Sequence, residues 1–104
     1  MSDVQLDLQF TGAIWHWRGP APFYFVTVPE DASAQLHEVA SAVSYGWGML
    51  PVGARIGSTR WRTSLWPKDG QYVLPVKLEV RRAEELDEGD VVTAWLFLGR
   101  DGSR

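Results

Sequence analysis

The chain has 104 residues, 45% hydrophobic and 22% charged, which is the size and composition of a single soluble domain covering residues 1–104. It contains no cysteine, which excludes disulfides, thiolate catalysis and cysteine-based zinc sites. The formal net charge of -3 argues against a general nucleic-acid-binding domain, because such domains are expected to be basic. Six tryptophans are many for this length, so aromatic rings should supply much of the core.

Strand-like patterns dominate the first thirty residues. Apolar and polar residues alternate over Val4–Phe10, with the period of two that is typical of a half-buried strand. Thr11 and Gly12 are expected to break this strand, and Ala13–Trp17 is expected to form its tail or a second strand. Phe23–Val28 is aromatic and β-branched throughout, which predicts a further strand.

A helical period follows Pro29. Apolar residues at helical spacing predict one amphipathic helix over about residues 30–44, with Glu30 and Asp31 favourably placed at its positive end. Glycines then end the helix and flank Trp47. A ring between two glycines is not held by its local backbone, so we expect Trp47 to pack onto another element or onto a ligand.

The second half of the chain contains four more predicted strands. They are Val52–Ile56, Thr59–Leu65, Tyr72–Arg81 and Val91–Leu98. A turn is expected over Pro67–Gly70, and Pro75 is expected to interrupt the ladder of its strand. Arg82–Asp87 has room for one helical turn, and residues 99–104 are expected to form a frayed tail.

Together these elements predict an all-β fold, mainly strands with one helix. Six to seven strands joined by short turns favour a small closed or nearly closed antiparallel barrel, with the helix packed on it or plugging one end. Closure also removes the exposed strand edges that so many apolar strands would otherwise present.

Several segments in this order resemble a known family. They are Phe25–Pro29, Val52–Gly57, Thr59–Pro67, Tyr72–Lys77, Val80–Arg81 and Glu88–Val92. Over about Leu6 to Leu98 the chain resembles the domain of unknown function 1905 family, small bacterial and archaeal proteins described as Greek-key β-barrels with one helix. The resemblance implies that fold and a bacterial or archaeal setting. It implies no catalytic residue, because the family has no assigned mechanism.

The predicted strand from Thr59 carries the best candidate for an anion site. Arg60 and Arg62 share one strand face, and Lys77 would lie across from them if the two neighbouring strands pair as a hairpin. Arginine offers a planar fork to carboxylate or phosphate, and lysine adds a point charge. The alternative is a solvated sheet face on which these cations pair with Glu79 or Asp90.

Aromatic residues suggest a second feature of the site. Trp47 or Trp66 would supply a stacking wall for the anion. The larger set of rings lines a cavity in the barrel, or forms its core, or covers its ends. This set comprises Trp15, Trp17, Tyr24, Trp47, Trp61, Trp66 and Trp95.

Catalytic and metal motifs are weak. His16 and His37 are the only histidines and lack ligand spacing, so neither a metal site nor a cofactor is expected. His16 remains a candidate general base, and no nucleophile elbow surrounds any serine.

The sequence therefore favours a binding module for a small anionic or aromatic ligand, or for a partner peptide, at a face rich in tryptophan and arginine. The alternative is a small cofactor-free enzyme acting on an apolar substrate in a tryptophan-lined barrel cavity. We expect a cytoplasmic protein without membrane or nucleic-acid partners, because no apolar run spans a bilayer and no secretory signal is visible. The ligand, the oligomeric state and the sheet face that lines the barrel stay open.

Overall fold

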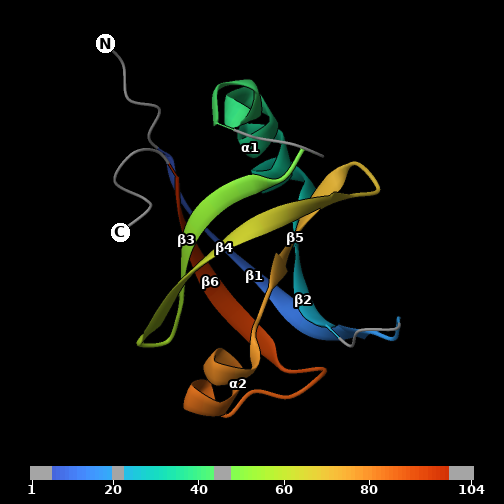
Figure 1. Cartoon of the computed structure of the whole chain (residues 1–104), viewed down its shortest axis with the longest axis vertical. Coiled ribbons are helices and arrows are strands. Elements are labelled where there is room, and N and C mark those ends of the chain that lie inside the picture. The colour runs from blue at the N-terminus through green and yellow to red at the C-terminus, as the bar shows by residue number, and fades with distance from the viewer. Residues whose placement is uncertain (1–5, 20–22, 44–47, 99–104) are drawn as a thin grey trace.

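Six antiparallel strands close into a barrel, and a helix lies at each of its ends (Figure 1). The computed structural model describes residues 6–19, 23–43 and 48–98. The strands are β1 (Leu6–Trp17), β2 (Phe23–Val28), β3 (Leu50–Ile56), β4 (Thr59–Lys68), β5 (Gln71–Pro75) and β6 (Val91–Leu98). The helices are α1 (Glu30–Val43) and α2 (Leu78–Glu84). The prediction of a mainly β barrel is confirmed, with two helices in place of one.

The strand order around the barrel is β1-β2-β5-β4-β3-β6. Strands β3, β4 and β5 follow one another as hairpins, and the chain then returns through α2 to place β6 beside β3. This long return connection beside the first hairpin strand is the Greek-key pattern. Closure pairs β6 with β1, so the first and last strands protect each other's edges.

Strand β1 is continuous, and the predicted break at Gly12 is wrong. The strand pairs with β6 over Leu6–Ala13 and with β2 over Ile14–Trp17, so Gly12 lies near the point where β1 passes from one partner to the other. A Cβ placed at Gly12 would stand 2.9 Å from Cγ1 of Val26, which is fully buried. Glycine therefore permits a close approach of β1 and β2 at this corner and does not end the strand.

Two tight turns set the registers of the β3–β4 and β4–β5 hairpins. Gly57 has a φ of 59° at the first turn position between β3 and β4, where a left-handed conformation favours glycine. Asp69 and Gly70 both have positive φ between β4 and β5, as a primed two-residue turn requires. The predicted turn is thus shorter than expected, because Pro67 and Lys68 belong to β4.

The predicted strand Tyr72–Arg81 ends much earlier, at Pro75. Helix α2 follows, and its Val80 is 1% exposed in the barrel core whereas Leu78 is 47% exposed. The alternating apolar residues in this stretch fit a strand and a short helix equally well, since seven residues contain too few periods to separate them. Packing of Val80 against the barrel decides between the two.

Helix α1 confirms the predicted amphipathic segment from Glu30 to Val43, and residue 44 lies outside the described residues. Its Ala32 and Leu36 are buried in the core. Ser33 is also buried; its hydroxyl donates to the Val28 carbonyl at 3.0 Å and accepts the Tyr72 amide at 3.3 Å. The helix is therefore tied to β2 and to β5 at once.

Side chains occupy the barrel interior. The alternation along β4 places Trp61 and Leu65 in the core and leaves Arg60 and Arg62 exposed outside. Burial raises the pKa of the Tyr72 hydroxyl above its ordinary value, because the charged form would lose its hydration. The interior is therefore packed, and two hollows with different linings lie on the outer faces of the sheet.

Candidate functional site

One outer face of the barrel, over β1, β2, β4 and β5, carries a cluster of large rings that we call the aromatic face. Its members are Trp15, Trp17, Phe23, Phe25 and Trp66. Trp66 meets Phe23 and Phe25 edge-on, with ring centroids 5.3 Å and 5.2 Å apart. Such edge-to-face pairs contribute about 0.5–1.5 kcal/mol beyond the area they bury. Phe25 is 2% exposed although it lies outside the main core cluster.

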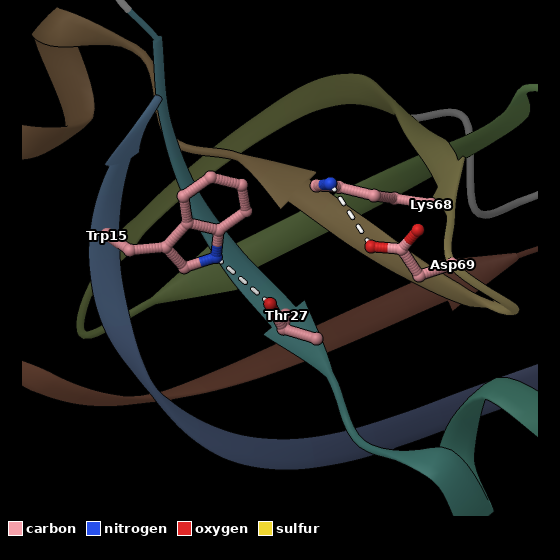
Figure 2. A network of polar contacts seen from close by, with 4 residues as sticks. All are labelled: Trp15, Thr27, Lys68 and Asp69. Carbon is pink, nitrogen blue, oxygen red and sulfur yellow. Dashed lines mark hydrogen bonds and ion pairs between the residues drawn. The ribbon is translucent and has the colours of Figure 1, made fainter. Parts of the chain in front are cut away.

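The aromatic face is hollowed by a pocket of about 200 Å³. The pocket is lined by Trp15, Trp17, Phe25, Trp66, Pro67, Lys68 and Val73. The indole N–H of Trp15 donates to the Thr27 hydroxyl at 2.9 Å, which fixes the orientation of this wall (Figure 2). At the rim, the Lys68 ammonium pairs with the Asp69 carboxylate at 3.2 Å (Figure 2).

A second outer face, over β3, β4 and β6, combines arginines with rings, and we call it the arginine face. Arg55 on β3 lies opposite Arg60 on β4 and opposite Trp95 on β6. The Arg55 guanidinium stands 4.1 Å from the centroid of Trp95, and that of Arg60 stands 5.3 Å from the centroid of Phe97. These are cation–π distances, so the rings position two cations on the sheet.

The arginine face has its own hollow, of about 290 Å³. It is lined by Gly53, Ala54, Arg60, Trp61, Arg62 and Phe97. Gly53 pairs with Phe97 on one side and with Arg62 on the other, and its missing side chain leaves a gap in this row of the face. The buried indole N–H of Trp61 has no hydrogen-bond acceptor among the described residues. A buried donor without an acceptor costs about 1–3 kcal/mol.

The structure divides the predicted site among several places. Arg60 and Arg62 lie on one strand face and line one hollow, whereas Trp66 lines the pocket of the other face. Lys77 is the exposed N-cap of α2 and stands beyond the end of β5, so it is not part of the β4–β5 ladder. Trp47 lies outside the described residues.

Several lining residues were missed or misplaced by sequence reasoning. Trp15 and Trp17 were expected to line a cavity, to form the core or to cover the barrel ends, and they wall an external pocket. Lys68 and Arg55 were not singled out. The sequence could have indicated Arg55, because side-chain alternation along Val52–Ile56 places it on the face opposite to Val52, Ala54 and Ile56.

His16 lies inside the barrel wall and opposite to its neighbouring tryptophans, as its place in the alternation predicts. Its ring stacks on Tyr24 with centroids 4.6 Å apart, and the Arg81 guanidinium stands 3.7 Å from the Tyr24 centroid. The buried Nε2 of His16 has no hydrogen-bond partner among residues 6–19, 23–43 and 48–98. The arrangement is a packed stack in which no described hydrogen bond orients this nitrogen for proton transfer.

Within the described ranges, no three His, Cys, Asp or Glu side chains come together as a metal site. None of the helices described is long and apolar enough to cross a bilayer.

Comparison with known proteins identifies a family. A family model described as a domain of unknown function, DUF1905, matches residues 10–96. The chain belongs to the DUF1905 family. The match runs from within β1 to within β6 and includes every residue that lines the two hollows except Phe97. A search of curated proteins finds no match.

Proposed function

We propose that this DUF1905 domain is a binding module, and that its ligand is a small aromatic acid held in the pocket of the aromatic face. The observation that carries the proposal is a ring-lined hollow on the outside of a sheet, with a lysine at its rim. Outer sheet positions are normally polar, and an apolar hollow with few polar groups at its edge is the usual form of a ligand pocket.

The size of the pocket limits the ligand. A cavity of roughly 150 Å³ is known to hold benzene in another protein, so about 200 Å³ suits one six-membered ring with a short substituent. The walls offer both ring faces and ring edges, which suit stacked and edge-on contacts with a bound ring. A ligand of two or more fused rings with long substituents would protrude into solvent.

The rim favours a negative charge on the ligand. The Lys68 ammonium has three donors, so it can meet a ligand carboxylate without giving up Asp69. The Lys68–Asp69 pair is exposed, and such pairs contribute only about 0–1 kcal/mol. We therefore expect most of the affinity to come from the rings and a smaller part from the charge.

Binding is favoured over catalysis by the position of the ionisable groups. The alternative of a small enzyme requires a titratable group inside a tryptophan-lined barrel cavity. The interior is instead filled by the core cluster, and Trp15 and Trp66 lie outside it. Lys68 is the one ionisable side chain among the pocket-lining residues, and a binding site needs no more than that.

The test is a titration with phenylacetate and with neutral benzyl alcohol, followed by the indole N–H resonances of an isotope-labelled protein. We expect both ligands to shift the signals of Trp15 and Trp66 and to leave that of Trp95 in place. Lys68→Met should lower the affinity for phenylacetate by about two- to fivefold, because an exposed ion pair contributes little. It should leave the affinity for benzyl alcohol unchanged.

Two variants complete the design. Lys77→Met removes the same charge from the exposed end of α2 and should change neither affinity. Trp17→Ala removes a wall of the pocket and should lower the affinity for both ligands. The fold should persist, because Trp17 is already 41% exposed. If neither ligand gives a saturable shift in Trp15 and Trp66, the proposal is wrong.

A further inference from the structure

The arginine face holds three guanidinium groups in a small area. Arg55 and Arg60 lie directly opposite each other on β3 and β4, and Arg62 is two residues further along β4 on the same face. At about 3.4 Å per residue, Arg60 and Arg62 start roughly 7 Å apart on the backbone. Long side chains rooted at this spacing can reach a common ligand above the hollow.

Arg55 and Arg60 are positioned before any ligand arrives. Trp95 lies under the Arg55 guanidinium and Phe97 near that of Arg60. Arg55 also donates from Nη1 to the Gly57 carbonyl at 2.7 Å. Side chains restrained in this way lose less conformational freedom on binding than free ones do.

The hollow of the arginine face lies beside Arg60 and Arg62, whose guanidinium groups are the charged donors among its lining residues. Arg60 and Arg62 form part of its lining, and so does Trp61, a buried residue whose ring belongs to the core cluster. The indole N–H of Trp61 has no acceptor among the described residues. That N–H is buried on the core side of β4, so the donors that an oxygen-rich anion would meet in the hollow are the guanidinium groups of Arg60 and Arg62.

We infer that the arginine face is a second binding site, separate from the aromatic pocket, for a compact ligand carrying two linked phosphate groups. Guanidinium forks match phosphate oxygens in bidentate geometry, and two arginines on one strand face suit two neighbouring phosphates. The hollow of about 290 Å³ has room for such a group. The formal net charge of -3 disfavours a long polyanion, which would extend beyond the arginines across an acidic molecule.

A diphosphate group has two sources, inorganic pyrophosphate and a nucleoside diphosphate. Titration calorimetry with sodium pyrophosphate and with ADP at low salt separates them. Equal affinities mean that the phosphates alone are recognised, and a tighter ADP complex means that the base is held as well. Inorganic phosphate should bind more weakly than pyrophosphate, because it engages fewer guanidinium donors.

Matched variants locate the site. Arg60→Gln and Arg62→Gln should each weaken pyrophosphate by about tenfold or more, because each removes charge-assisted hydrogen bonds. Arg82→Gln removes the same charge from an exposed position on α2 and should lower the affinity for pyrophosphate by less than about twofold. All three variants should keep the far-ultraviolet spectrum of the native protein.

A second readout does not depend on substitution. Pyrophosphate should move the side-chain Nε–H resonances of Arg60 and Arg62 and the amides around Phe97, and should leave the indole signals of Trp15 and Trp66 in place. The inference is overturned if the native protein shows no saturable pyrophosphate binding, if Arg82→Gln weakens it as much as Arg62→Gln, or if a single-stranded oligothymidine binds more tightly than either diphosphate. Phenylacetate and pyrophosphate should bind together, so failure of one site leaves the other open to its own test.

Discussion

Strand β4 contributes to both outer faces, and the contrast between its two ends explains why residues predicted to form one site lie on two faces. Its first part, Thr59–Leu65, pairs with β3 and presents Arg60 and Arg62 on the arginine face. Its last part, Trp66–Lys68, pairs with β5 and presents Trp66 on the aromatic face. Side-chain alternation puts all three on the outside, but a strand that bends around a barrel does not keep them in one plane.

The two faces also differ in what holds them. Rings of the aromatic face pack on one another, and one of them is as buried as a core residue. The arginine face rests on cations placed over single rings, with its arginine side chains in partial or full contact with solvent. We therefore expect the aromatic face to carry stability as well as binding, and the arginine face to carry binding with little stability.

The largest expected effect is the loss of stability on Phe25→Ala. Removal of a buried phenyl ring from a packed cluster should lower the free energy of unfolding by about 3–5 kcal/mol. Phe97→Ala on the arginine face, where the ring is half-buried, should cost about 1 kcal/mol. Urea unfolding followed by circular dichroism compares the two. Equal losses would show that the aromatic face is not a second packed cluster.

A salt titration should distinguish ligand binding at the two faces, with a smaller difference than the one expected between the two losses of stability. Raising the sodium chloride concentration from about 0.05 M to about 0.5 M should lower the affinity for pyrophosphate by roughly tenfold, because this affinity rests on exposed charges. The affinity for phenylacetate should fall by less than about threefold, since ring contacts supply most of it. Calorimetry of both ligands in the same buffers gives the comparison, and parallel losses would remove the distinction between the sites.

The smallest expected effect concerns Arg62→Ala. Its side chain is exposed, so the free energy of unfolding should change by no more than about 0.5 kcal/mol while pyrophosphate binding falls. Thermal and urea unfolding of this variant provide the check. A sharp drop in melting temperature would make Arg62 a structural residue and would remove the main support for the arginine site.

The barrel was predictable because local patterns agree with the global fold over most of the chain. Phe23–Val28 and Val91–Leu98 have strand composition and strand period, and both are strands of six and eight residues. The segment after Pro75 was not predictable, because its short apolar alternation fits two structures. Gly12 was misread as a breaker, since the proximity that explains it involves Val26 on the next strand.

The candidate sites were predictable in composition and not in position. Arg60 and Arg62 were predicted to share one strand face, and Trp66 was predicted to stack beside them; the structure places the arginines and Trp66 in two different hollows. Lys77 was assigned to the site through a strand that ends two residues before it. Arg55 and Phe97 join the arginine face through pairing of β3 with β4 and β6.

By itself the sequence determined the type of fold, the helix after Pro29, the hairpin turns and the inside–outside alternation of β4, because these depend on residues close together along the chain. Only the tertiary structure decided where the two outer faces lie and which residues share each hollow. That decision rests on strand order and register around a closed barrel, which bring together residues such as Gly53 and Phe97 from distant parts of the chain. Local periodicity carries no information about such pairings.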